Sequence, residues 1–325
     1  MTTSGGVELA QRLVGWSDIV IENMRPGVME RLGLGYEAAR ALNPRVVMIS
    51  SCNMGQTGPR AQTPGFGSQL SALAGFCGLS GSPDGPPMLL YGPYIDYIAS
   101  SLGGVAVLAA LDRQRRSGQG AWIDLAQYES GLMFVAGALL NFHTTGAVVE
   151  RSCNNDPVAI PHDAYPCAGG QWVALSCWSD AEFRRLAMVL ERDDLAEDPR
   201  FADAESRREN AEALYEIIAQ WSQTRGADAA AAELQAAEIH SYPVNTIADL
   251  FSDPQLVHRR LWRRRRHGVL GDFSSYYSAF ELSETAGDVT GAAPRIGADN
   301  EFVFQGLLGL TDEEFGSYRK QGAFD

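Results

Sequence analysis

The sequence predicts an α/β fold organised as two domains. Two short apolar runs at 18–22 and 45–50, each suited to a buried parallel strand, are separated by helical segments, which is the pattern of a βαβ unit. From about residue 160, a strand pair followed by polar helices indicates a separate α+β domain. The 325 residues, 45% of them hydrophobic, suffice for two domains of ~100–200 residues each.

Apolar spacing and glycine or proline breaks define the elements of the first domain. Helices are expected at 7–14, 28–42 (as two short pieces), 67–79, 96–113 and 128–142, and strands at 18–22, 45–50 and 121–126, with a further short strand ending at Gly92-Pro93.

The second domain begins with a predicted hairpin, because 164–166 and 172–176 alternate in polarity around Gly169-Gly170. Helices are expected at 180–191, 207–224 and 227–237, then a strand at 276–282 and a terminal helix at 300–308. The predicted division is 1–159 for the first part of the large domain, 160–258 for the small α+β domain, and 259–325 for a return segment and the C-terminal part of the large domain.

Charge and residue usage exclude several classes of protein. The 26 Lys and Arg against 40 Asp and Glu leave a net charge of −14, which repels phosphate backbones and argues against nucleic-acid binding. The five cysteines and five histidines have neither disulfide-framework nor metal-ligand spacing, so no metal is expected. Without a visible membrane span or signal peptide, we expect a soluble, cytoplasmic protein.

One aspartate lies where a Gly-Pro turn meets a long apolar helix. Asp96 follows Gly92-Pro93 and opens this helix. Spacing alone favours a plain N-cap, which aspartate fills well. The alternative is a nucleophilic carboxylate at a strand-to-helix junction, where backbone N–H groups stabilise developing negative charge.

A second candidate site lies between the first strand and the next helix, where open α/β sheets bind phosphorylated ligands. Arg25 and Arg31 in this segment have the chemistry to pair with phosphates, or they are solvated loop arginines. A third feature is the basic run from Arg259 to His267, which has the composition of a nucleic-acid patch or a targeting signal. In a chain of charge −14, a solvated edge or interface segment is the favoured interpretation.

The sequence has no P-loop, Gly-x-Ser-x-Gly, His-Glu-x-x-His or complete Gly-x-Gly-x-x-Gly motif. Instead, nearly the whole chain resembles the family III CoA-transferases, the group that contains formyl-CoA and carnitine CoA-transferases. The matching segments, in the family's order, are 17–36 (Ser-Asp-Ile-Val-Ile-Glu-Asn-Met-Arg-Pro-Gly-Val-Met-Glu-Arg-Leu-Gly-Leu-Gly-Tyr), 42–45, 55–59, 81–87, Ile95-Asp96, 117–124 (Ser-Gly-Gln-Gly-Ala-Trp-Ile-Asp), 198–201 and 253–256.

This resemblance implies a Rossmann-like large domain, a smaller α+β domain and an interlocked homodimer. It implies transfer of CoA from an acyl-CoA thioester to a carboxylic acid through an aspartyl anhydride and an aspartyl-CoA thioester, with Asp96 as the nucleophile and no metal. The residues that it assigns to CoA contacts are Asn23, Met24, Arg25 and Arg31 in one stretch, and Thr63, Pro64, Gly65 and Phe66 in another.

The family's opening Gly-x-Arg-Val-Leu-Asp-Leu segment is not recognisable here, so we expect the large domain to lack its first strands. Two alternatives to an active transferase remain. One is an inactive chain or partner subunit. The other is a 2-methylacyl-CoA racemase of the same fold, which places a His-Asp pair in the stretch corresponding to 64–67. This chain has Phe66 and Gly67 there, so transferase activity is favoured.

Overall fold

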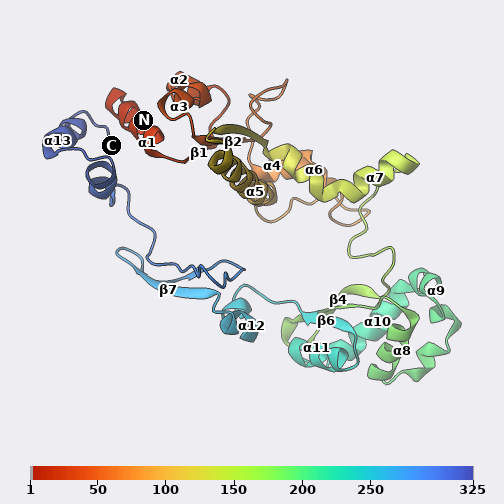
Figure 1. Cartoon of the computed structure of the whole chain (residues 1–325). Coiled ribbons are helices and arrows are strands. Elements are labelled where there is room, and N and C mark those ends of the chain that lie inside the picture. Colours follow the sequence, from red (N-terminus) through yellow and green to blue (C-terminus); the bar gives the residue numbers. More distant parts are fainter. Residues whose placement is uncertain (1–2, 325) are drawn as a thin grey trace. The chain divides into compact units, whose positions relative to one another are not determined.

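The computed structural model describes residues 3–324, which form two compact units (Figure 1). Unit 1 comprises the chain up to Arg151 and again from Pro294 onward, and unit 2 comprises Ser152–Ala293. The structure thus divides the chain near 151 and 293, whereas the sequence placed the divisions near 159 and 258.

Residues 259–293 fall in unit 2 because aromatic and polar contacts tie their first strand to the preceding segment. The Trp262 indole N–H donates to the Leu250 carbonyl oxygen at 3.0 Å. The Trp262 ring also stacks on Phe251, with centroids 4.3 Å apart and an interplanar angle of 18°.

Three parallel strands form the sheet of unit 1. They are β1 (Ile19–Glu22), β2 (Val47–Cys52) and β3 (Ala121–Ala126), in the order β1-β2-β3. The central strand β2 is buried at all but one position, as expected where a parallel strand has a paired neighbour on each side. The three predicted strands and the predicted α/β fold class are confirmed.

Helices flank this sheet and extend beyond it in Figure 1. They are α1 (Ser4–Trp16), α2 (Val28–Arg31), α3 (Tyr36–Leu42), α4 (Gly67–Leu73), α5 (Tyr94–Ser117), α6 (Gln127–Leu132), α7 (Ala136–Thr145) and α13 (Asp312–Lys320), with 3₁₀ turns at Phe76–Gly78 and Met133–Val135 and a π-helical segment at Glu301–Leu307. The two ends of the chain meet, since Leu9 of α1 forms a buried cluster with Leu310 and Tyr318. This contact places the C-terminal segment in unit 1.

Several predicted elements of the chain need correction. The helix expected at 67–79 is broken after α4, because Gly75 adopts a left-handed φ of 91°. The helix expected at 207–224 is divided at Asn210, whose φ of −110° and ψ of 26° are not helical. No strand precedes Gly92-Pro93, in a stretch whose prolines lack the N–H needed for strand pairing.

The helix α5 is the longest in the described chain. Its apolar part, with a mean hydropathy of 1.5 and 28% of its residues buried, meets the length and composition criteria for a membrane span. Core helices of water-soluble proteins meet the same criteria. Arg115 and Arg116 lie in its last turn, and Gly118 ends it with a left-handed φ of 72°.

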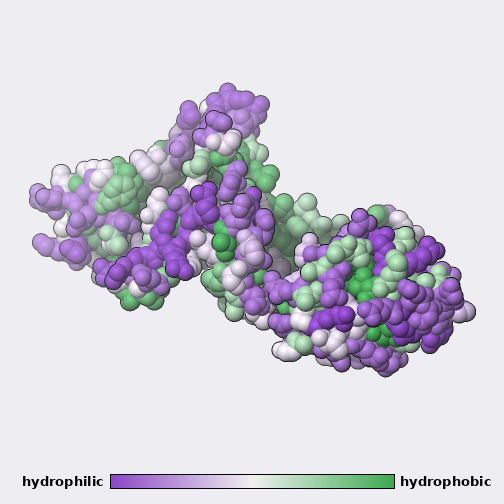
Figure 2. All heavy atoms as spheres, turned by 90° about the horizontal axis from the view of Figure 1, so that it is seen from below, coloured by the Kyte–Doolittle hydropathy of each residue, from purple (hydrophilic) through white to green (hydrophobic). Residues whose placement is uncertain are grey.

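Unit 2 contains a three-stranded antiparallel sheet with helices packed on it. The strands are β4 (His162–Pro166), β5 (Trp172–Ser176) and β6 (His240–Pro243), and the helices are α8 (Asp180–Val189), α9 (Ala204–Glu209), α10 (Ala211–Ser222), α11 (Ala227–Ala236) and α12 (Pro254–His258), with 3₁₀ turns at Ala168–Gly170, Asp193–Ala196, Pro199–Phe201 and Asp249–Phe251. The predicted hairpin is confirmed, and β6 was not predicted. The helical surface of this unit, on the right in Figure 2, is mainly hydrophilic.

The arginine run forms a strand of its own. Strands β7 (Trp262–His267) and β8 (Gly271–Tyr276) make a separate antiparallel hairpin. The strand predicted at 276–282 is therefore displaced. The observed strand, β8, is positioned by its pairing with β7, and it ends at Tyr276, where the predicted strand begins.

Candidate active site

A cavity of about 760 Å³ in unit 1 opens at the carboxyl ends of the parallel strands. Ligands of open α/β sheets bind at this edge, because the loops that follow the strands meet there. The lining residues come from the ends of β1 and β2, the loop 61–66, and the starts of α4, α5 and α6: Ile21, Glu22, Asn23, Met24, Arg25, Pro26, Ser51, Cys52, Asn53, Ala61, Thr63, Pro64, Gly65, Phe66, Gly67, Asp96, Ser100 and Gln127.

Asp96 lies in this cavity and is not the N-cap of its helix. The helix α5 begins at Tyr94 with Pro93 as its N-cap residue, so Asp96 lies in the first turn and caps no backbone N–H. Its carboxylate accepts no hydrogen bond from any residue in 3–324, and burial raises its pKa above the ordinary value. The N-cap interpretation is therefore wrong, and the structure leaves the carboxylate available for chemistry.

Glycine at position 67 allows the start of α4 to approach this carboxylate. A Cβ added to Gly67 would lie 2.8 Å from Asp96 Oδ2 and 2.7 Å from Pro93 Cβ. Both distances are shorter than the van der Waals contacts that a Cβ atom makes. Any residue larger than glycine would therefore displace the carboxylate or the helix.

The segment after β1 is held by a buried glutamate. The Glu22 side chain is only 8% exposed, and its Oε2 accepts the Met24 backbone N–H at 2.7 Å. The Gln62 side-chain amide donates to the Pro26 carbonyl oxygen at 3.1 Å, which joins this segment to the loop across the cavity. Arg25 is thus presented at the cavity wall by a fixed backbone.

The second predicted stretch, from Thr63 to Phe66, forms the opposite wall. The Asn53 side-chain amide donates to the Gly65 carbonyl oxygen at 2.9 Å, which fixes this loop to the end of β2. Gln69 Oε1 accepts the Phe66 N–H at 3.2 Å at the start of α4. The Phe66 ring is 80% exposed and therefore offers an apolar face to a ligand.

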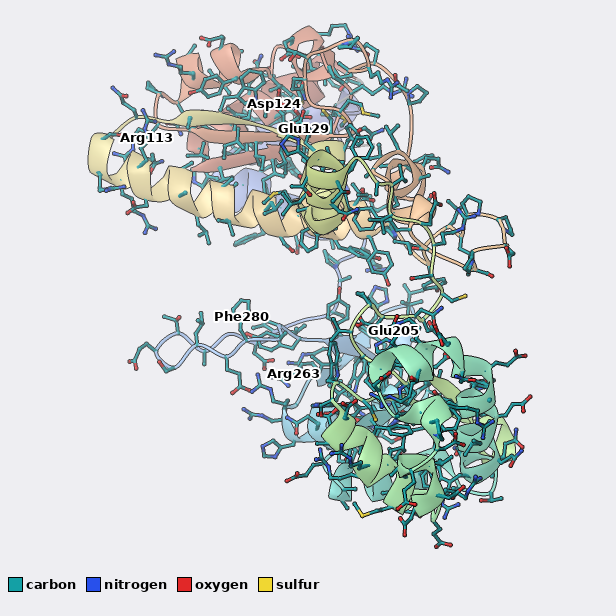
Figure 3. The ribbon with its side chains drawn as sticks, turned by 90° about the vertical axis from the view of Figure 1, so that its right-hand side faces the viewer. Arg113, Asp124, Glu129, Glu205, Arg263 and Phe280 are labelled. Carbon is teal, nitrogen blue, oxygen red and sulfur yellow. The ribbon has the colours of Figure 1, made fainter. Side chains whose placement is uncertain are left out.

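Asp124 supports the loop that follows β2. Its two carboxylate oxygens accept the Gln56 backbone N–H at 3.0 and 3.1 Å. Asp124 is labelled in Figure 3 and belongs to β3. The hydrogen bonds from Gln56 to Asp124 hold the glycine-rich turn 55–59 against the sheet. Gly55 in this turn has a left-handed φ of 82°.

The structure brings together eight of the nine residues predicted for the site: Asp96, Asn23, Met24, Arg25, Thr63, Pro64, Gly65 and Phe66. Arg31 lies on α2, is exposed and does not line the cavity. Its assignment to CoA stays a prediction.

Sequence reasoning missed several residues that line the same cavity: Glu22, Asn53, Gly67, Ser100 and Gln127. Asn53 and Gln127 follow directly on β2 and β3, so the rule that strand ends share one edge would have found them.

The described lining of this cavity contains no histidine. The acid–base pair of the racemase alternative therefore has no histidine member here. Within residues 3–324, no three His, Cys, Asp or Glu side chains are grouped so that they could hold a metal ion.

The raised pKa of Asp96 predicts a pH-dependent stability difference for the Asp96→Asn variant. The partly buried carboxyl is harder to ionise in the folded protein than in the unfolded chain, so its ionisation opposes folding. This cost is absent below the ordinary pKa and grows as pH rises through the raised value. We expect Asp96→Asn to unfold at a higher temperature than the wild type at about pH 7.5, and the difference to shrink toward about pH 4, as measured by calorimetry. A constant difference at all pH values would contradict this.

Comparison with known proteins identifies the family to which the chain with this cavity belongs. Residues 1–300 match the sequence profile of CoA-transferase family III. The chain belongs to CoA-transferase family III. It is thus an enzyme that moves CoA between an acyl-CoA thioester and a carboxylic acid, and the resemblance noted in its sequence is confirmed.

Curated relatives match this transferase along almost its whole length. A succinyl-CoA–D-citramalate CoA-transferase of Chloroflexus aurantiacus is 34% identical over 314 residues, which cover 97% of this chain and 78% of the relative. The alpha subunit of a succinyl-CoA–L-malate CoA-transferase of Chloroflexus aurantiacus is 32% identical over 317 residues, which cover 97% of this chain and 74% of the relative.

A solved structure has the same fold. The crystal structure of a CAIB/BAIF family protein from Brucella suis superposes on the transferase with a TM-score of 0.87 at 27% identity, covering 94% of this chain and 79% of that chain. The α/β fold with a smaller second domain is therefore shared with this family.

Proposed function

We propose that the transferase moves CoA from an acyl-CoA donor to a carboxylic acid acceptor through covalent intermediates on Asp96. The observation that carries this proposal is the state of the Asp96 carboxylate, which lies in the cavity without a hydrogen-bond donor from residues 3–324 and with a pKa raised by burial. A partly desolvated carboxylate is more nucleophilic than a solvated one, and no neighbouring base is needed because it attacks in its ionised form.

The proposed reaction has four steps, and in each step one bond forms while one leaving group departs. The Asp96 carboxylate attacks the thioester carbonyl and expels CoA thiolate, which leaves a mixed anhydride. The thiolate attacks the aspartyl carbonyl, so the first acid leaves as a carboxylate and an aspartyl-CoA thioester forms. The acceptor carboxylate attacks this thioester to give a second anhydride and thiolate. The thiolate then attacks the acceptor's acyl carbonyl and frees Asp96.

Each tetrahedral step places negative charge on a carbonyl oxygen, and this charge requires hydrogen-bond donors. Backbone N–H groups beside Asp96 are candidates, among them that of Gly67, whose Cα lies against the carboxylate.

CoA is proposed to bind between the two walls of the cavity, with Arg25 pairing with its phosphates and Asn23, Met24 and the stretch from Thr63 to Phe66 contacting the rest. A guanidinium forms bidentate hydrogen bonds with phosphate oxygens, and Glu22 and Gln62 hold the Arg25 segment in place before the ligand arrives. Because the curated relatives act on succinyl-CoA, D-citramalate and L-malate by name, short dicarboxylic acids are the first acceptors to test.

The proposed function is tested by assaying the purified chain with succinyl-CoA and a panel of mono- and dicarboxylic acids. We expect formation of a new acyl-CoA without loss of total thioester, and hydroxylamine treatment during turnover should convert Asp96 to a hydroxamate detectable by mass spectrometry. Hydrolysis of the thioester without transfer to any acid, or an adduct on another residue, would contradict the proposal.

Arg25→Ala is expected to weaken CoA binding by ~5- to 150-fold, the equivalent of ~1–3 kcal/mol for a charge-assisted hydrogen bond. The loss should diminish at high salt, because ions screen the attraction between Arg25 and the phosphates in the wild type. Calorimetric titration with CoA measures both effects. Arg31→Ala is the comparison, and because Arg31 lies outside the cavity lining we expect a smaller change. Equal effects of the two substitutions would indicate that the CoA phosphates bind nearer to α2 than proposed.

We also propose that the transferase is a homodimer. Large apolar side chains on α5 and α7 are exposed in the single chain, including Val105 and Leu108, which lie three residues apart on one face of α5. Sedimentation equilibrium should give twice the mass of one chain, and Leu108→Glu should shift the equilibrium toward single chains. A single-chain mass at every concentration would contradict the homodimer.

A further inference from the structure

The arginine run is sorted into two sets by the alternation of strand β7. Figure 3 shows Arg263 on this hairpin. Arg263 and Arg265 lie on one face, where both pair with Asp288 at 2.8 and 3.2 Å, and Arg263 also stacks over the Tyr277 ring at 4.9 Å. This face of the hairpin is therefore occupied within the chain.

The opposite face carries arginines with no partner in the described chain. Arg264 and Arg266 are exposed, and neither side chain forms an ion pair or hydrogen bond with any residue in 3–324. In the strand register, Arg264 lies opposite Ser274 and Arg266 opposite Asp272. The Asp272 carboxylate forms no ion pair with either arginine.

These side chains line a cavity of about 660 Å³ that lies wholly within unit 2. Its lining residues are Phe251, Arg264, Arg265, Arg266, Asp272, Phe273 and Ser274. The volume falls within the ~300–1,000 Å³ range of small-molecule sites. The cavity shares no residue with the one that contains Asp96.

The local charge makes this cavity attractive to an anion. Residues 259–276 carry six arginines and one aspartate, and Asp288 offsets one further charge, which leaves a net of +4 in a chain of net charge −14. Two guanidiniums on one face, two residues apart, repel each other, and a multivalent anion between them relieves this repulsion. Guanidiniums also match the geometry of phosphate oxygens, with which they form paired hydrogen bonds.

An aromatic platform adjoins the two arginines. Trp262 lies opposite Tyr276 in the register and therefore on the same face as Arg264 and Arg266. Phe251 stacks on Trp262 and is 50% exposed while lining the cavity. Its free side is available to stack on a planar ring such as a nucleobase.

We propose that this cavity binds a nucleotide, with its phosphates on Arg264 and Arg266 and its base on Phe251. The Ser274 hydroxyl is placed to donate a further hydrogen bond to the sugar or a phosphate. Two sources share this chemistry: a free nucleotide, and the nucleotide end of a CoA molecule. The proposal does not depend on the function assigned to Asp96.

The test is calorimetric titration of the whole chain with ADP and, separately, with pyrophosphate. We expect both to bind, and Arg264→Gln/Arg266→Gln to weaken both by at least tenfold. The matched control is Arg115→Gln/Arg184→Gln, which removes the same charge from two exposed arginines without partners and should leave both affinities unchanged. Phe251→Leu should weaken ADP several-fold and leave pyrophosphate unchanged.

The Arg25→Ala variant separates this site from the cavity of unit 1. ADP binding at the hairpin should persist in Arg25→Ala and disappear when Arg264→Gln/Arg266→Gln is added. In the same background, CoA binding that is lost with the two hairpin arginines identifies CoA as a source of the nucleotide, and binding of ADP alone identifies a free nucleotide.

Failure of ADP and pyrophosphate to bind at millimolar concentration, or equal binding to the double variant and its control, would overturn the proposal. An unchanged ADP affinity in Phe251→Leu would overturn the stacking. Neither outcome bears on transfer at Asp96, which is assayed independently.

Discussion

Replacing Asp96 by asparagine is expected to reduce kcat for CoA transfer by ~10³-fold or more, because the amide cannot attack the thioester or carry CoA. CoA affinity should change little, since the proposed phosphate contacts come from the Arg25 segment. Steady-state kinetics and calorimetric titration with CoA measure the two quantities on the same preparation.

Asp112→Asn on the same helix is the matched control. Asp112 pairs with Arg116 on the exposed surface of α5, where an ion pair contributes ~0–1 kcal/mol, so its loss should leave transfer unchanged. If Asp96→Asn retained more than a few per cent of wild-type turnover, the covalent route through this residue would be untenable.

Gly67→Ala is expected to reduce kcat by ~10- to 100-fold, because displacing a catalytic group by about 1 Å is enough for such a loss. The new methyl group would occupy the space of Asp96 Oδ2, at 2.8 Å, and of Pro93 Cβ, at 2.7 Å. The carboxylate must therefore move, while the proposed CoA contacts stay in place, so KM for acyl-CoA should change far less than kcat.

Gly137→Ala on α7 separates this effect from a general response to a glycine substitution. A Cβ at Gly137 meets nothing within 4 Å, so this substitution should leave activity unchanged and add ~0.5–1 kcal/mol of helix stability. Circular dichroism confirms that each variant is folded. Unchanged kcat in folded Gly67→Ala would mean that the position of the Asp96 carboxylate does not limit the reaction.

Local pattern alone was enough to predict much of unit 1. The apolar runs at 18–22, 45–50 and 121–126 formed β1, β2 and β3. The central strand β2 is buried at nearly every position, which is why its run is largely apolar. The helix predicted at 67–79 was too long because of the conformation of one residue. The left-handed φ of Gly75 ends the helix, although the apolar spacing continues beyond it.

Strand pairing between distant residues was not predictable in the same way. The polar run His240–Pro243 forms β6 only because β5 offers it an edge, and the arginine run forms β7 only because it pairs with β8. Neither segment has the alternating apolar pattern from which strands are predicted, since each is specified by its partner.

The candidate site shows the same division. The sequence by itself determined which residues are candidates for the chemistry, since the resemblance pointed to Asp96, the Arg25 segment and the Thr63–Phe66 stretch without coordinates. Only the tertiary structure decided that Asp96 caps no helix, that Gly67 lies against its carboxylate, that Glu22 holds the Arg25 segment, and that Arg31 lies outside the cavity. The physical reason is that residue identity and local conformation are written along the chain, whereas burial, close approach and hydrogen-bond partners depend on segments that meet only when the parallel sheet brings its strand ends to one edge.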